Sequence, residues 1–335
     1  GTVDADYDAS KDLAGVVVKR DEILDTNNVL TGYSLSVMAK ENAVIVDSDG
    51  QTVSSSSRWG LHPDNAGTNG FPTTLLAEVA EASNLSSAND TALTNHPRSG
   101  IVNGTNYNYQ YIDSYYLDAT KDDGYAEIYV GTDAPSSAAD FASRQNTATI
   151  KAHADAIMLG YLDISVPTTM AELGDAMKAL RESNSGSTIY DEFFYPAAYA
   201  CALYEPSVSK GGLDTQYSKG RWALPAAGLL ARIYNFYHNS RGRVTSSSIS
   251  VNYADETITT EANIPLFANM MERIADKSAG GVSPFVYPTN RTFWSSTEVS
   301  GSYAWGCYFG SGYFNNGGRY AQYASRPVAA FTFDV

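Results

Sequence analysis

The residue types that most often carry catalysis or hold metal ions are few and scattered in this chain. Its four histidines lie far apart, and none has a second ligand four residues away on a helix, the spacing that zinc sites on helices use. The acidic stretches beginning at Asp47 and Asp122 lack the glycine at the sixth position and the glutamate at the twelfth position of a calcium-binding loop. We therefore expect no metal site and interpret both stretches as polar turns.

The sequence also contains no motif for catalysis by a cysteine thiol or a serine hydroxyl. Cys201 lies in an alanine-rich helical stretch and Cys307 in a strand of tyrosine and glycine, so the sequence leaves open whether the two form a disulfide bond or stay free. No motif around either residue would lower the pKa of a thiol. The chain also lacks a phosphate-binding glycine motif and the Gly-x-Ser-x-Gly turn of many hydrolases. We expect no catalytic residues, no cofactor and a protein that is not an enzyme.

The unusual composition lies near the C-terminus, in "FWSSTEVSGSYAWGCYFGSGYFNNGGRYAQYASRPVAAF", residues 293–331. Within residues 299–325, five Tyr, six Gly, four Ser and two Asn fill 17 of 27 positions. Antibody paratopes use these residue types, because tyrosine gives rigid contact area and the small polar residues give adaptable hydrogen bonds. The stretch predicts a ligand-contacting face; the alternative is that its tyrosines only cover a sheet. The contact candidates are Tyr303, Tyr308, Tyr313, Phe314, Asn315, Asn316, Tyr320 and Tyr323.

The overall composition limits the partners. The chain has 335 residues, of which 43% are apolar and 18% are charged, as in folded proteins. Its net charge is −15 and it contains no run of basic residues, which excludes nucleic acid as an expected partner. No stretch is long and apolar enough to predict a membrane-spanning helix.

Strands are predicted at both ends of the chain and helices in the middle. "AGVVVKR" and "YSLSVMAKE" read as two strands joined by the polar connection 21–32 with hairpin character. In the helix that follows residue 168, Thr169 and Glu172 form a capping box ahead of an apolar stripe. Three further helices are predicted to begin with a proline in the first turn, namely Pro196, Pro225 and Pro265.

This order of elements predicts an α+β fold in which both ends of the chain join one sheet. We expect an N-terminal extension at residues 1–13 and one domain at 14–335. Residues 62–136, rich in Asn, Ser, Thr and Gly, read as an insertion with a short helix at 73–83 and a strand at 125–130.

Separated motifs along the chain occur in an order that is found in a known family. They are "NTATIKAHADA", "YPAAYACALYE", "GRWALPAAGLLARIYNF", "FWSSTEVSGSYAWGCYFGSGYF" and "SRPVAAF". Together they resemble the Fibrobacter succinogenes major paralogous domain and related exported proteins of Bacteroidetes, with W-x-L-P-x-x-G-E-L, Y-W-S-S-T-E, A-W, F-x-x-G and R-P-V-R-A-F. The opening strands resemble that family as well. Departures occur at Leu229 for Glu, Phe293 for Tyr and Ala329 for Arg, and the first speaks against a functional acid there.

The resemblance implies a C-type-lectin-like fold, with small antiparallel sheets, packed helices and long irregular insertions. A fold of this kind does not by itself define a function. The triplets with which true C-type lectins bind calcium and sugar, Glu-Pro-Asn and Trp-Asn-Asp, do not occur here. The related formylglycine-generating enzymes need a reactive cysteine pair, which the setting of the two cysteines does not indicate. The resemblance assigns a structural frame to Trp222, Trp294, Glu298, Trp305 and Arg326.

The resemblance further implies a protein of the bacterial surface, secreted or anchored in the outer membrane as a lipoprotein. We expect an adhesin or lectin-like protein that binds a glycan or a protein through its tyrosine-rich stretch. The alternative is a structural or tip subunit of a surface fibre such as a fimbria, in which this stretch packs on a neighbouring subunit.

Some similar C-type-lectin-like proteins are the variable proteins of diversity-generating retroelements, which randomise adenines in AAC codons. Of residues 299–325, only Trp305 and Gln322 cannot be reached from AAC by such changes. The composition is therefore compatible with diversification of this stretch, and it is equally compatible with an undiversified member of the family.

Overall fold

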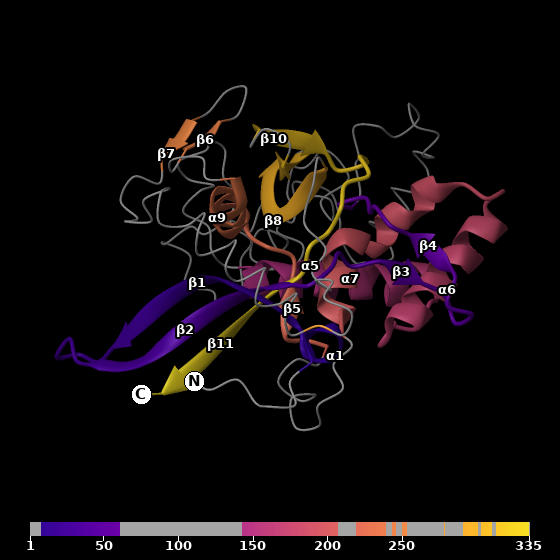
Figure 1. Cartoon of the computed structure of the whole chain (residues 1–335). Helices are drawn as coiled ribbons and strands as arrows, with labels where there is room; N and C mark the ends of the chain where they lie inside the picture. Colours follow the sequence, from indigo (N-terminus) through magenta and orange to yellow (C-terminus); the bar gives the residue numbers. More distant parts are fainter. Residues whose placement is uncertain are drawn as a thin grey trace.

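The computed structural model describes residues 8–60, 143–206, 219–238, 243–245, 250–252, 278, 291–300, 303–309 and 313–334. The predicted insertion at 62–136, with its helix and strand, lies outside these residues, as does the helix expected at Pro265. The described part combines small, mostly antiparallel sheets with a few helices, which confirms a mixed α+β class (Figure 1).

The first sheet joins the two ends of the chain, as predicted. Its strand order is β1-β2-β11-β5, formed by β1 (Gly15–Leu24), β2 (Leu30–Ala39), β11 (Val328–Asp334) and β5 (Trp222–Ala223). β2 pairs antiparallel with both β1 and β11, so the sheet is built around an N-terminal strand. In Figure 1, β1, β2 and β11 extend together away from the helices.

The β1–β2 hairpin has a shorter connection than the predicted one at 21–32. Both strands continue into that stretch and leave only residues 25–29 between them. The Asp25 carboxylate accepts the N–H groups of Asn27 and Val29, each at 2.8 Å, and Asn28 takes a left-handed φ of 60°. These local bonds close the turn tightly, so the polar residues on either side remain free to extend the ladder.

The second sheet contains the tyrosine-rich stretch. It has the order β7-β6-β10-β9-β8. Its three longer strands β8 (Thr292–Ser300), β9 (Tyr303–Tyr308) and β10 (Tyr313–Gly318) are antiparallel neighbours. The short strands β6 (Arg243–Thr245) and β7 (Ser250–Asn252) extend the sheet beyond β10.

The helices lie mainly in the middle of the chain. α1 (Ala9–Asp12) precedes β1, and α5 (Ser143–Ile157) continues into a π-helical turn η4 (Met158–Leu162). They are followed by α6 (Met170–Ser183), the 3₁₀ helix η5 (Thr188–Phe194), α7 (Pro196–Leu203) and α9 (Ala227–His238). A small hairpin of β3 (Ile45–Val46) and β4 (Thr52–Ser54) packs against α6.

The start of α6 has the predicted capping residues. Thr169 is the N-cap, and its hydroxyl oxygen accepts the Glu172 N–H at 3.2 Å. The Glu172 carboxylate accepts mainly from Thr168, whose N–H and hydroxyl donate to it at 2.7 and 2.9 Å, and the Thr169 N–H makes a smaller contribution. The two donors of Thr168 therefore add to the single donor of the standard motif.

The predicted proline starts have different outcomes. Pro196 occupies the first turn of α7, as expected. Pro225 does not begin a helix, because α9 starts only at Ala227. The N–H of Ala226 donates to the Ser143 hydroxyl and that of Ala227 to the Thr297 hydroxyl, both at 2.8 Å. Groups distant in sequence therefore set the start of α9.

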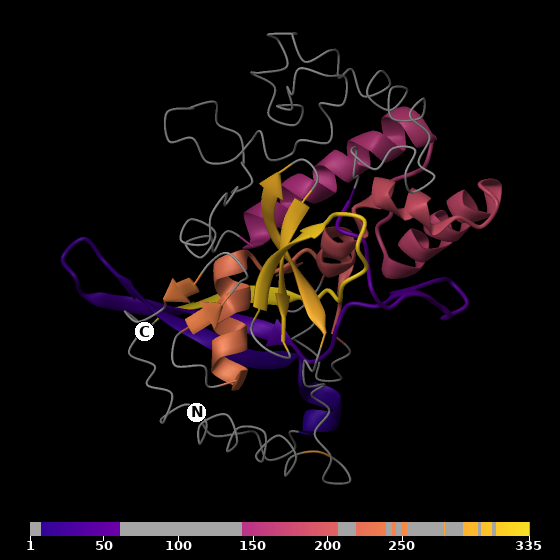
Figure 2. The ribbon, with the colours of Figure 1, turned by 90° about the horizontal axis from the view of Figure 1, so that it is seen from above.

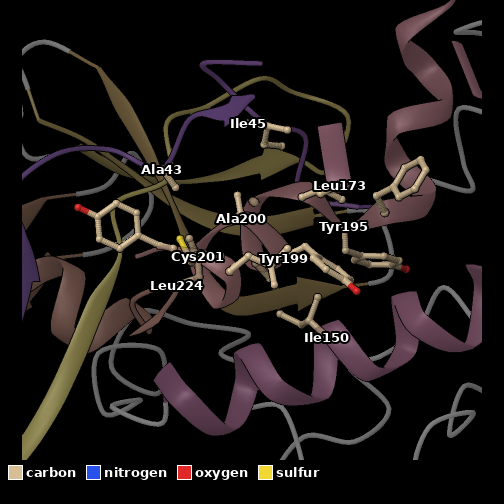
Figure 3. Packing of buried hydrophobic residues seen from close by; sticks show 14 of the residues in the cluster. Ala43, Ile45, Ile150, Leu173, Tyr195, Tyr199, Ala200, Cys201 and Leu224 are labelled. Atoms are coloured by element: carbon tan, nitrogen blue, oxygen red, sulfur yellow. The ribbon is translucent and has the colours of Figure 1, made fainter. Parts of the chain in front are cut away.

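Strands β8 and β9 separate two apolar clusters. On one side, α9 packs with β1 over buried residues that include Phe293, Trp305 and Cys307. On the other side lie α5, α6 and α7 with Trp294 and Ala304. Figure 2 shows α9 and α5 on either side of these strands. In Figure 3, α7 lies in the middle of the second cluster, with Ile45 on one side of it and Ile150 of α5 on the other.

The β3–β4 turn provides a test of the fold at low pH. The Lys178 ammonium donates to Asp47 at 2.6 Å, and the Gln51 and Asp49 N–H groups donate to its other oxygen, which together hold the pKa of Asp47 below its usual value. Because the folded pKa is depressed, the stabilisation is present at neutral pH and is lost as the pH falls below about 4.

We therefore predict that Asp47→Asn lowers the thermal midpoint at pH 7 and that the difference from wild type narrows at pH 3, measured by circular dichroism. Asp49→Asn, an exposed change in the same turn, is the control. A difference that is constant between the two pH values would contradict the role of the Asp47 charge.

Candidate ligand-binding face

The structure exposes some of the predicted contact residues and buries others. Tyr303, Tyr308 and Tyr320 are 42%, 37% and 41% exposed, which is high for such large side chains, and Asn316 is exposed as well. Tyr323 is half-buried, and its ring lies 4.2 Å from that of Trp294. Tyr323 therefore belongs to the packing of the core rather than to a contact surface. The side chains of Tyr313, Phe314 and Asn315 lie outside the described residues.

Strand alternation divides the exposed tyrosines between two faces. Tyr303 and Tyr308 stand at the two ends of β9, five positions apart, so they point to opposite faces of the sheet. Tyr303 pairs with Gly318 of β10, and Asn316, two positions from Gly318, shares the same face. Strand alternation thus separates Tyr308 from Tyr303, while Tyr303 and Asn316 are diagonal neighbours on one face of the sheet.

Tyr320 joins these two residues because of a glycine. A Cβ atom added to Gly318 would lie 2.5 Å from Cε1 of Tyr320, which shows that the tyrosine ring covers Gly318. That Cβ position points to the face of Tyr303, the residue paired with Gly318. The three exposed side chains Tyr303, Asn316 and Tyr320 therefore form one group, which we call the tyrosine patch.

The opposite face is built in the same way around Gly317. A Cβ atom there would lie 2.7 Å from Cε2 of Tyr323 and 2.9 Å from Cη2 of Trp294. These two rings are packed in the core. Adjacent glycines thus hold aromatic rings closely on both faces of β10. The ring at Gly318 is the exposed Tyr320, although Trp305 on the same face is buried, and both rings at Gly317 are packed in the core.

The segment of residues 57–59, which the sequence analysis did not single out, holds the backbone of the tyrosine patch in place. The indole N–H of Trp59 donates to the Ser295 carbonyl, and that of Trp294 donates to the Ser57 carbonyl, both at 2.8 Å. Between the two bonds, the Arg58 guanidinium donates to Glu192 at 2.8 Å and to the Tyr320 carbonyl at 2.9 Å. The backbone of Tyr320 is therefore held by a largely buried ion pair while its ring stays exposed.

The turn that carries Tyr320 has a second attachment. Arg319 is fully buried, and its guanidinium lies 4.7 Å from the centre of the Trp59 ring. The backbone carbonyl of Arg319 accepts the backbone N–H of Trp59 at 2.8 Å. In the sequence, only the dipeptide "RW" at 58–59 points to this role. Its bonding partners are more than 200 residues away for Tyr320 and Ser295, so they could not be predicted from the dipeptide.

The expected frame residues are buried where the structure describes their side chains. Trp222, Trp294 and Trp305 are at most 3% exposed. Arg326 is buried and donates to the Ala39 carbonyl at 2.9 Å and to Asn42 at 3.0 Å, a tie of the predicted kind. The side chain of Glu298 lies outside the described residues, although its backbone pairs with Ala304.

Cys201 and Cys307 are free, buried and assigned to different apolar clusters. Burial raises the pKa of each thiol well above its usual value. The possibility of a disulfide bond between them is thereby resolved in favour of two separate thiols. In the described part of the chain, no group of three or more His, Cys, Asp and Glu could hold a metal ion. None of the described helices is long and apolar enough to cross a membrane.

Searches against protein-family models, curated proteins and solved structures each returned no match. The resemblance to the Fibrobacter family therefore stays a prediction.

The same substitution to alanine is expected to destabilise the protein by different amounts at Gly317 and Gly318. Gly317→Ala should lower the free energy of unfolding by about 1–3 kcal/mol, because two core rings must shift. Gly318→Ala should cost under about 1 kcal/mol, because the outer part of the exposed Tyr320 ring can swing away. Urea denaturation measures both, with the exposed change Asn316→Ala as control. Equal losses at the two glycines would contradict the two-sided arrangement.

The thiols predict slow chemical modification. Neither cysteine should react rapidly with Ellman's reagent in the native protein, and two thiols per chain should react in guanidinium chloride, because both are buried and unpaired. A fast native reaction, or fewer than two thiols after denaturation without reductant, would disagree with the structure.

Proposed function

We propose that this chain is a non-enzymatic ligand-binding protein of the bacterial surface, an adhesin or lectin-like protein. It recognises a glycan or a protein through the tyrosine patch of Tyr303, Asn316 and Tyr320. The observation that carries the proposal is the placement of two exposed tyrosines and an asparagine on one face, next to a glycine that Tyr320 covers. Such rings offer contact area at low entropic cost.

The support beneath the patch favours recognition. Arg58 fixes the Tyr320 backbone, and the buried Arg319 fixes the turn from the other side. A ligand that binds the patch therefore has to order side chains but not the backbone, which limits the entropic cost of binding. A patch of this size suits a saccharide ring or one loop of a partner protein rather than a large interface.

We also propose a C-type-lectin-like fold for the domain. Two observations support it: strands from both ends of the chain pair in one sheet, and a second sheet carries the candidate binding residues. Diversification by a retroelement would fit this arrangement, since the patch residues lie within 299–325 and the unreachable Trp305 is buried.

The experiment compares a double variant within the tyrosine patch with a single control variant on the other face of the sheet. The double variant Tyr303→Ala/Tyr320→Ala should weaken binding to any ligand found on glycan and protein arrays by at least about tenfold, as expected for aromatic hot spots. Tyr308→Ala removes an equally exposed tyrosine from the other face and should leave the affinity within about twofold. The proposal fails if the double variant, with an unchanged thermal midpoint, binds like wild type.

A second candidate function, a structural subunit of a surface fibre, is favoured by the edge of the first sheet. β1 has ten residues and forms an outer strand of that sheet among the described residues. Val17 and Leu24 on this strand are 41% and 47% exposed. A long edge strand with exposed apolar side chains is a template for pairing with another chain.

The same protein samples separate the two candidates. Analytical ultracentrifugation over a wide concentration range should show a monomer if recognition by the patch is the function. Growth of large species that Val17→Ser/Leu24→Ser prevents, without an effect on ligand affinity, would identify the fibre subunit instead.

A further inference from the structure

A cavity lies among residues that are distant in sequence from the tyrosine patch. It has a volume of about 410 Å³ and lies between α5, residues 166–168 ahead of α6, the C-terminal end of α7 and residues 219–222. Pockets of a few hundred Å³ accommodate small organic molecules. None of the described residues that line this cavity is acidic, although the chain has a net charge of −15.

One part of the cavity wall is apolar and rigid. Val166, Pro167 and Leu203 contribute aliphatic surface. Trp222 also lines the cavity, is 2% exposed and packs edge-on against Tyr204 with ring centres 5.2 Å apart. Such a wall suits the apolar body of a ligand, because it loses little freedom when the ligand binds.

The other part of the wall is cationic. Arg144 and Lys151 both belong to α5, seven positions apart and thus on the same face of the helix. Lys219 lies across the cavity on the segment ahead of β5. Three positive side chains from two separate segments therefore border one small space.

These three cations differ in how far they are already neutralised. Lys151 is paired with Asp155 at 2.8 Å and lies over the Tyr199 ring. Lys219 donates its ammonium to the neutral Thr168 carbonyl at 2.9 Å, while its backbone N–H donates to Glu205 at 3.1 Å. The side chain of Arg144 is exposed and forms no hydrogen bond or ion pair with any residue that the structure describes. Arg144 thus retains its charge for an anion, whereas the charge of Lys219 is partly compensated by the nearby Glu172 carboxylate.

We propose that this cavity binds a small organic carboxylate with an apolar body. Arg144 receives the carboxylate, because the guanidinium offers two parallel donors that match its two oxygens, and Lys219 adds a second charge. The apolar body lies against Leu203 and Trp222. The proposal is independent of the tyrosine patch, since the two sites share no residue.

The probe is 3-phenylpropionate, with 3-phenylpropionamide as a neutral analogue of the same shape and acetate as a carboxylate without the body. Isothermal titration calorimetry on the whole chain should show the phenylpropionate binding at least about tenfold more tightly than either analogue. Equal binding of the amide would overturn the role of the cations, and equal binding of acetate would overturn the role of the apolar wall.

Variants locate the binding within the chain. Arg144→Gln should weaken phenylpropionate binding by about tenfold or more. Arg20→Gln removes the same charge from an exposed residue of β1 and should have no effect. Ala148→Leu keeps every cation but fills the cavity from an exposed position of α5, and should abolish binding at an unchanged thermal midpoint. Equal losses in Arg144→Gln and Arg20→Gln, or undiminished binding in Ala148→Leu, would overturn the proposal.

Discussion

The exchange of indole hydrogen bonds between Trp59 and Trp294 is the interaction on which the rest of the described structure depends. The Trp59 indole donates to the carbonyl of Ser295, one residue after Trp294, and the Trp294 indole donates to the carbonyl of Ser57, two residues before Trp59. All four residues are buried. A buried carbonyl that lost its donor would cost about 1–3 kcal/mol. The pair therefore fixes an N-terminal segment against a C-terminal strand, and places Arg58 where it can hold both Glu192 and the Tyr320 turn.

Sequence signals predicted the structure where the bonding partners are local, and failed where the partners are distant in the sequence. The Thr169 cap and the Pro196 start were predictable because their partners lie within a few positions. The start of α9 was not, since the hydroxyls that bond its first N–H groups lie 83 and 70 residues away. The same holds for Trp59, whose acceptor is 236 residues away.

The candidate site shows the same division. Its composition identified the tyrosine-rich stretch, and the pairing of β9 with β10 decided which residues act together. Alternation alone would have placed Tyr303 and Tyr308 on opposite faces, but the register that opposes Tyr303 to Gly318 was not readable from the sequence. The cationic cavity left no motif at all, because its charges come from segments separated by 68 or more residues and from a helix whose pattern marks only its buried side.

The adjacent glycines Gly317 and Gly318 make the two sides of β10 unequal in what mutation can do to them. On the Gly317 side, the rings of Trp294 and Tyr323 leave no room for change without loss of the fold. On the Gly318 side, the three nearest atoms all belong to the exposed Tyr320 ring. Substitutions next to Gly318 should therefore be tolerated more readily than substitutions next to Gly317, so the composition of the proposed tyrosine patch can vary at little cost to the stability of the fold.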